Sequence, residues 1–174
     1  MMNKIFICLF LLAGFNASHA ETRDVNRYFF DAKLGDFQSD LATAKKEGKI
    51  GVLIMFEQDD CPWCLRMKQT ILNQSDVQDY YRKHFLIFPV DLKGNIPMVD
   101  FKGIETTEKA YSIKQRIYGT PVFDFFDLDG NRMVRFPGAA KDVDEFLLLG
   151  RYVVEGAFKD MPFALYKRKG LPAK

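Results

Sequence analysis

The chain has 174 residues, with 25 Lys and Arg against 23 Asp and Glu, and a formal net charge of +2 at pH 7. This near-neutral balance gives no electrostatic reason to expect binding to nucleic acid or to an anionic membrane surface. The length suits a single domain that is large enough to bury a substantial hydrophobic core.

The first twenty residues have the pattern of a secretory signal peptide. Lys4 precedes an apolar run over residues 5–15, and small residues follow at Ser18 and Ala20. The apolar run is too short to cross a membrane, which takes about 20 residues of helix. We therefore expect cleavage after Ala20, one mature domain over residues 21–174 and, in a Gram-negative cell, a periplasmic location.

After this leader, hydrophobic periodicity and turn residues predict alternating helices and strands. In chain order, the predicted elements are a helix at 34–49 with Asp36 as its N-cap, a strand at 50–57, a helix from Pro62, a short polar helix at 76–85, a strand at 85–92, an inserted loop or hairpin at 93–104, a helix at 105–119, a hairpin of strands at 121–126 and 131–136, and a helix at roughly 142–158. Alternation followed by a hairpin indicates an α/β fold, in which a mixed central β-sheet has helices on both faces.

Two cysteines, Cys61 and Cys64, stand where a predicted strand gives way to a helix that begins at Pro62. A zinc site usually needs four ligands, and His84 is the one histidine that follows the leader, so we expect no metal. A purely structural disulfide is a poor fit, because a crosslink stabilises more when it closes a longer loop.

A reversible redox couple explains the placement of the pair. The N-terminus of a helix favours a thiolate, so we expect Cys61 to be the exposed nucleophile. Cys64, one turn into the helix, would then resolve the mixed disulfide. Between them, Trp63 is either an ordinary partly exposed helix residue or an apolar rim on which a partner docks. Downstream, Pro121 opens a strand after Thr120, a position where proline removes no central ladder bond.

These motifs resemble those of the thioredoxin superfamily: a strand, CPWC at the start of a helix, and TP ahead of a hairpin and a closing helix. The resemblance implies a thioredoxin-like fold with a redox-active disulfide, Cys61–Cys64, in place of a bound cofactor. It also implies that the Thr120–Pro121 bond is cis and packs against the cysteines, and that Thr120 pairs backbone to backbone with a substrate peptide.

The stretches FEQDDCPWCLRM, DFKG, TPVFDFFDLDGN and RYVVEGAFKDMPFALYKRKG further resemble the periplasmic thioredoxins of the SoxW type. That likeness implies a reductant of disulfides in client proteins. Its implied electron donor is a membrane thiol-transfer reductase, and it would supply an exported pathway such as the oxidation of sulfur compounds.

The chain departs from ordinary thioredoxins near the motif. Met55 stands where they carry a buried aspartate that handles the proton of the resolving cysteine. Glu57 lies on the same strand face, two residues nearer the helix, so it is a candidate general base for Cys64. The alternative is an exposed carboxylate at the end of a strand.

The charges near the motif also bear on its redox poise. Glu57, Asp59 and Asp60 precede the nucleophile, and Arg66 and Lys68 are the nearest cations along the chain. Like charges disfavour ionisation, so we expect the pKa of Cys61 to be only modestly depressed. The couple should then be more reducing than a DsbA-type oxidant.

We therefore predict a secreted thiol:disulfide oxidoreductase that reduces protein disulfides. A DsbA-like or DsbC-like oxidant or isomerase is the alternative closest in chemistry, since a proline also follows the first cysteine in the oxidase motif. CPWC also resembles the CPYC of glutaredoxins, although a secreted enzyme would meet little glutathione. A third possibility is a non-enzymatic binding module whose disulfide is inert.

Overall fold

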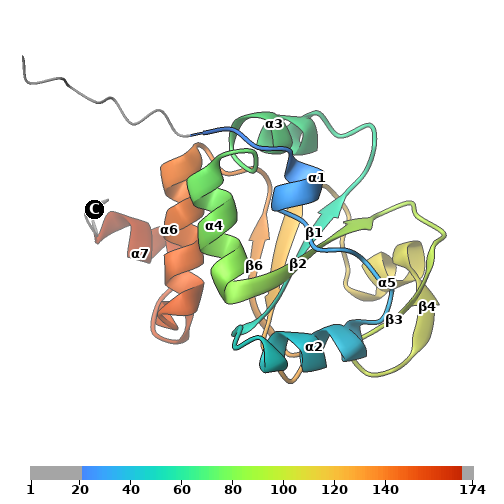
Figure 1. Cartoon of the computed structure of the whole chain (residues 1–174). Helices are drawn as coiled ribbons and strands as arrows, with labels where there is room; N and C mark the ends of the chain where they lie inside the picture. The colour runs from blue at the N-terminus through green and yellow to red at the C-terminus, as the bar shows by residue number, and fades with distance from the viewer. Residues whose placement is uncertain (1–20, 170–174) are drawn as a thin grey trace, which may run out of the picture.

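The computed structural model describes residues 21–169, and the predicted signal peptide lies outside them. Its elements, labelled in Figure 1, are α1 (Val25–Tyr28), α2 (Phe37–Lys46), β1 (Gly51–Glu57), α3 (Pro62–Thr70), α4 (Ser75–His84), β2 (Phe85–Asp91), β3 (Pro97–Val99), β4 (Glu105–Thr107), α5 (Glu108–Lys114), β5 (Val122–Phe126), β6 (Arg132–Pro137), α6 (Val143–Val154), the 3-10 helix η1 (Ala157–Lys159) and α7 (Phe163–Arg168).

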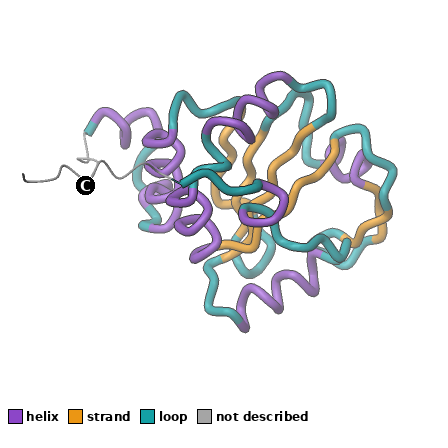
Figure 2. The backbone as a smooth tube through the Cα atoms, turned by 45° about the horizontal axis from the view of Figure 1, so that its top comes forward, coloured by secondary structure: helices purple, strands orange, loops and turns teal. Residues whose placement is uncertain are grey.

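The central sheet has the strand order β2-β1-β5-β6. β1 and β2 are parallel and joined through helices α3 and α4, whereas β5 is antiparallel to both β1 and β6. Helices lie on both sides of these strands, as Figure 2 shows. The expected mixed sheet with two covered faces is therefore confirmed.

Alternation along β1 divides the core into two halves, because successive side chains of a strand point to opposite faces. Leu53 and Met55 join a cluster with buried residues of α3, α4 and α6. Val52, Ile54 and Phe56 join a second cluster with buried residues of α2 and the region around α5. The continuous apolar run at residues 50–56 is therefore explained by a strand that is buried on both faces.

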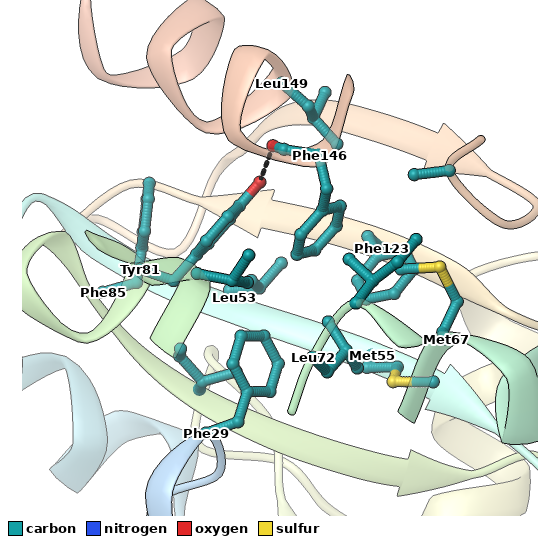
Figure 3. Packing of buried hydrophobic residues seen from close by; sticks show 14 of the residues in the cluster. Phe29, Leu53, Met55, Met67, Leu72, Tyr81, Phe85, Phe123, Phe146 and Leu149 are labelled. Atoms are coloured by element: carbon teal, nitrogen blue, oxygen red, sulfur yellow. Dashed lines mark hydrogen bonds between the residues drawn. The ribbon is translucent and has the colours of Figure 1, made fainter. Parts of the chain in front are cut away.

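Aromatic packing fixes α4 against α6 on one face of the sheet (Figure 3). The rings of Tyr81 and Phe146 stack with their centroids 4.5 Å apart, and the Tyr81 hydroxyl donates a hydrogen bond of 2.6 Å to the carbonyl oxygen of Phe146. Phe123 of β5 meets Phe146 edge to face at 5.0 Å. This cluster continues to Cys61 and Cys64, so the motif sits at the border of a well-packed core.

The segment that follows α1 runs along the outer side of β2. The Asp31 N–H donates to the carbonyl oxygen of Ile87 at 2.8 Å, and the Ile87 N–H donates back to the Asp31 carboxylate at 2.8 Å. Arg82 pairs with the same carboxylate at 2.8 Å. Burial is the largest influence on this carboxyl group and raises its pKa.

The insert between β2 and α5 is the hairpin β3–β4, one of the two forms expected, but it extends past the expected bounds of 93–104 because its second strand is Glu105–Thr107. It is anchored to the segment before α2, because the Val99 N–H donates to the carbonyl oxygen of Gly35 at 2.7 Å. An ion pair between Lys33 and the buried Glu108 fixes the end of the hairpin to the same segment.

The prediction of a helix at 105–119 is wrong at both ends, since the helix covers only Glu108–Lys114. The first three residues of the predicted range form β4, because β-branched Thr106 and Thr107 pair with β3, and the Thr107 hydroxyl then caps α5 by accepting from the Ala110 N–H at 3.2 Å. The helix ends at Lys114, and Arg116 adopts a left-handed backbone with φ of 58°.

The last long helix is shorter than expected. It ends at Val154, because Gly156 takes a left-handed conformation with φ of 73° and starts a 3-10 turn. The short helices α1 and α7 were not anticipated, since neither is long enough to show hydrophobic periodicity.

Candidate functional site

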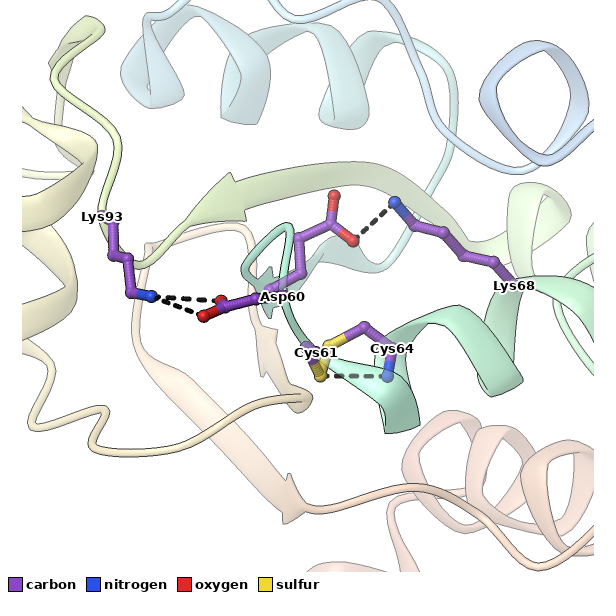
Figure 4. The surroundings of a disulfide bond; sticks show 6 residues. Asp60, Cys61, Cys64, Lys68 and Lys93 are labelled. Carbon is purple, nitrogen blue, oxygen red and sulfur yellow. Dashed lines mark hydrogen bonds and ion pairs between the residues drawn. A yellow bond between two sulfur atoms is a disulfide. The ribbon is translucent and has the colours of Figure 1, made fainter.

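The two cysteines form a disulfide at the N-terminus of α3, directly after the turn that follows β1 (Figure 4). Cys61 is the N-cap residue, and its sulfur accepts a hydrogen bond of 3.0 Å from the Cys64 N–H. Pro62 occupies the first helical position, where its missing N–H costs nothing. The helix dipole and a backbone donor are therefore both directed at the sulfur of Cys61.

Neither cysteine is widely exposed. The exposed fraction is 6% for Cys61 and 3% for Cys64, so the expectation of an exposed Cys61 is wrong for this oxidised form. Both belong to the core cluster that contains Met67, Phe123 and Ala140, and these come from three different parts of the chain. Exposure at this point depends on tertiary packing, which the local sequence does not encode.

Two lysines pair with the carboxylates beside the disulfide. Lys68 on α3 lies 2.6 Å from Glu57, and Lys93, at the start of the insert, donates to both oxygens of Asp60 at 3.1 Å. Figure 4 shows Lys68 and Lys93 on opposite sides of the disulfide. The hydrogen bond from Lys93 lowers the pKa of Asp60. The acidic character expected upstream of Cys61 is thus partly neutralised.

Glu57, the candidate base, is the last residue of β1, and its side chain is 18% exposed. It is shielded and paired with Lys68 rather than free in solvent. Met55, on the same strand face, is fully buried and offers no ionisable group. Glu57 is therefore the one residue of β1 that could accept a proton.

Arg66 was expected to be one of the cations nearest to Cys61. In the structure it connects α3 to the segment before α6. Its guanidinium donates to the carbonyl oxygens of Ala140 and Lys141, ahead of α6, and lies 5.9 Å from the ring of Trp63. Trp63 is 59% exposed, and Leu65 on the same helix is also exposed. The start of α3 thus carries two outward apolar side chains, of which only Trp63 was a predicted contact for a partner.

The Thr120–Pro121 peptide bond is cis, as expected. The register of β1 and β5 pairs Phe56 with Val122, which brings Pro121 to the end of β1 from which the motif loop departs. The carbonyl oxygen of Pro121 accepts from the Gly138 N–H at 2.8 Å. Within residues 21–169, the backbone N–H and C=O of Thr120 make no hydrogen bond to another backbone group.

A hollow of about 370 Å³ adjoins this bond. Its lining residues are Arg116, Ile117, Tyr118, Gly119, Thr120, Pro121, Val122, Arg135, Pro137 and Gly138. Of these lining residues, Thr120 and Pro121 were predicted from the sequence, and those before them were not.

Across residues 21–169, no group of three or more His, Cys, Asp or Glu side chains is arranged to hold a metal ion. In the same part of the chain, no helix has the length and apolar character that a membrane span requires.

The sequence model of the thioredoxin-like domain family matches residues 37–153. A thioredoxin-fold protein from Helicobacter pylori is similar in structure, with a TM-score of 0.61 and 19% identity over 70% of this chain and 84% of that one. A Thermus thermophilus thioredoxin has a TM-score of 0.54 and 25% identity, covering 71% and 88%. The C-terminal domain of Neisseria meningitidis DsbD, in its reduced form, has a TM-score of 0.50 and 21% identity, covering 65% and 89%. No curated protein matches the sequence significantly.

Proposed function

Because the chain belongs to the thioredoxin-like domain family, we propose that it is a thiol:disulfide oxidoreductase that reduces disulfides in client proteins. The observation that carries the proposal is the Cys61–Cys64 disulfide at the N-terminus of α3, where the sulfur of Cys61 accepts the Cys64 N–H. A disulfide that only stapled the fold would gain little from closing so short a loop.

In the proposed reaction, the reduced protein attacks a client disulfide through the Cys61 thiolate. The client S–S bond breaks, a mixed disulfide forms, and the first client sulfur leaves as a thiolate that takes a proton from water. The Cys64 thiol then loses its proton, and its thiolate attacks the sulfur of Cys61. This step re-forms the Cys61–Cys64 disulfide and releases the second client thiolate. Two electrons have passed to the client, so a dithiol protein must reduce the pair before the next cycle.

We assign Glu57 to the proton transfer from Cys64. Cys64 is almost fully buried, so its proton needs a nearby acceptor. Glu57 ends the strand that leads into the motif, and Lys68 orients its carboxylate at 2.6 Å. Trp63 and Thr120 would bind the client, the first through exposed apolar surface and the second through its backbone groups.

The reducing direction, the SoxW-type role and the periplasmic location are parts of the same proposal. They are supported by the signal-peptide pattern at residues 1–20 and by the sequence resemblance described above. The electron donor would be a membrane thiol-transfer reductase.

One observation favours a second candidate, an oxidant that donates its disulfide. Lys68 and Lys93 offset two of the carboxylates next to Cys61, which leaves the helix dipole less opposed and would favour a stable thiolate. Ultraviolet titration of the reduced protein separates the two directions. A Cys61 pKa of about 3.5, the value typical of DsbA, would favour the oxidant.

The test of the chemistry is to trap the mixed disulfide. Cys64→Ser should accumulate covalent adducts with disulfide-containing clients, because the resolving thiol is gone, and reducing agent should release them. Cys61→Ser is the matched control and should form none. Adducts with Cys61→Ser alone would reverse the two roles, and adducts with neither variant, together with no catalysis of insulin reduction by dithiothreitol, would contradict the oxidoreductase.

A further inference from the structure

Arg116 has an unusual backbone for its residue type. It is the only non-glycine residue with positive φ among residues 21–169. The left-handed conformation is unfavourable for side chains with a Cβ and is normally taken by glycine. Here it ends α5: the Arg116 N–H donates to the carbonyl oxygen of Ile113 at 2.9 Å and the Ile117 N–H donates to that of Ser112 at 3.0 Å, a common way for a helix to end. Arg116 lies four residues before Thr120, in the loop that leads to the cis bond.

The side chain of Arg116 is exposed, and it forms no ion pair with any residue that the structure describes. Arg135, the other cation of the hollow, is already engaged. Its guanidinium donates hydrogen bonds of 2.7 and 2.5 Å to the two carboxylate oxygens of the buried Asp124, and one of 3.0 Å to the carbonyl oxygen of Gln115. Arg135 thus has a carboxylate partner, which it shares with Arg132 at 3.7 Å, whereas Arg116 has no carboxylate partner among the described residues.

The hollow that these residues line is positive and open to a peptide. None of its lining residues is acidic, and Thr120 and Pro121 form one part of its wall. Tyr118, which is 85% exposed, stands between Arg116 and Thr120 in the chain. An extended peptide that pairs with the backbone of Thr120 would present alternate side chains toward this surface.

We infer that the hollow is a specificity subsite for an acidic side chain of the client, Asp or Glu, close to the client cysteine. The inference rests on the proposed function and names the clients that the site prefers. The Arg116 guanidinium would bind the client carboxylate, for which its planar donor geometry is suited. Tyr118 would pack against the apolar part of the same peptide segment.

The test compares three disulfide-bonded peptides that differ only in Glu, Gln or Lys on both sides of the cysteine. The second-order rate of their reduction by the reduced protein is measured by stopped flow at low and high salt. We expect the Glu peptide to react about threefold to fivefold faster than the Gln peptide at low salt, which is the range of an exposed ion pair. The Lys peptide should be reduced most slowly. High salt should make the three rates of reduction more alike, because it screens the charges.

Variants of Arg116 test whether this residue is the source of the preference for the Glu peptide. Arg116→Gln should abolish the preference for Glu, and Arg116→Glu should reverse it in favour of Lys. Arg116→Gly suits the positive φ and should resist urea better than the wild type while still losing the preference. Lys45→Gln on α2 removes a positive charge outside the lining of the hollow and should keep the preference for Glu.

The outcomes separate this inference from the function on which it rests. Equal rates for the three peptides, or a Glu preference that survives Arg116→Gln and Arg116→Gly, would overturn the acidic subsite and leave the reductase intact. Failure to reduce any of the peptides would contradict the reductase itself.

Discussion

Replacing Asp40 by Asn should stabilise the protein at neutral pH and have little effect in mild acid. Asp40 lies on the buried side of α2 and is 6% exposed, and its Oδ2 atom has no hydrogen-bond partner among the residues described. Burial, reinforced by the negative charges of Asp36 and Asp31, raises the pKa of its carboxyl group to about 6.

The sign of the pH dependence follows from comparing the two states. An Asp in the unfolded chain has a pKa of about 3.9. Between that value and about 6, the unfolded chain has lost the proton that the folded protein still holds, so the free energy of unfolding falls as pH rises. Below this window both states are protonated, and above it both are ionised and the loss is complete.

The shift of about two pKa units is worth on the order of 3 kcal/mol at about 1.4 kcal/mol per unit. An Asn side chain avoids ionisation but still buries an imperfectly paired polar group, so we expect a gain of about 2 kcal/mol at pH 7. At pH 4 the gain should shrink to less than about 0.5 kcal/mol. Urea unfolding of the oxidised wild type and variant at both pH values measures the difference.

Asp36→Asn provides the control in the same helix. Hydrogen bonds from Ser39 hold the pKa of Asp36 below its usual value, so its ionised form is favourable and this variant should be no more stable than the wild type at pH 7. No gain in stability for Asp40→Asn at pH 7, or an equal gain at pH 4, would contradict a raised pKa for Asp40.

Two further predictions concern buried charge and proton transfer. Asp124→Asn leaves Arg135 without its buried counter-ion and should lower the free energy of unfolding by about 3–5 kcal/mol, measured by urea unfolding; a loss below about 1 kcal/mol would show that this pair is unimportant. Glu57→Gln should slow resolution of the Cys61 mixed disulfide at least about tenfold, followed by quenched-flow analysis of the adduct. Resolution at the wild-type rate would remove Glu57 from the mechanism, and Asp59→Asn serves as its charge control.

The core of the site could be predicted because its determinants are adjacent in the chain. An apolar run, two cysteines and Pro62 specify a strand, a turn and a helix start without knowledge of distant contacts. Predicting a cis bond at Thr120–Pro121 also required the family resemblance, because nothing in the local sequence requires a cis bond.

The missed features depend on partners that are far apart in the sequence. Lys93 contacts Asp60 across 33 positions, and Lys33 contacts Glu108 across 75. The three residues of β4 are held as a strand by their pairing with β3, so helical periodicity misassigned them. For the same reason the burial of Cys61 could not be seen, since it arises from neighbours on other elements.

The backbone pairing of Asp31 with Ile87 has a consequence for solubility. An uncovered outer strand is a template on which another chain can add by hydrogen bonding, which promotes aggregation. Asp31 occupies this template on β2 with both its N–H and its carboxylate. At the opposite margin of the sheet, β6 carries Arg132 and ends at Pro137, and charge and proline both discourage such addition. The two margins are thus protected by different means. Asp31→Ala removes the carboxylate that accepts from the Ile87 N–H and should increase self-association more than it changes the rate of thiol exchange.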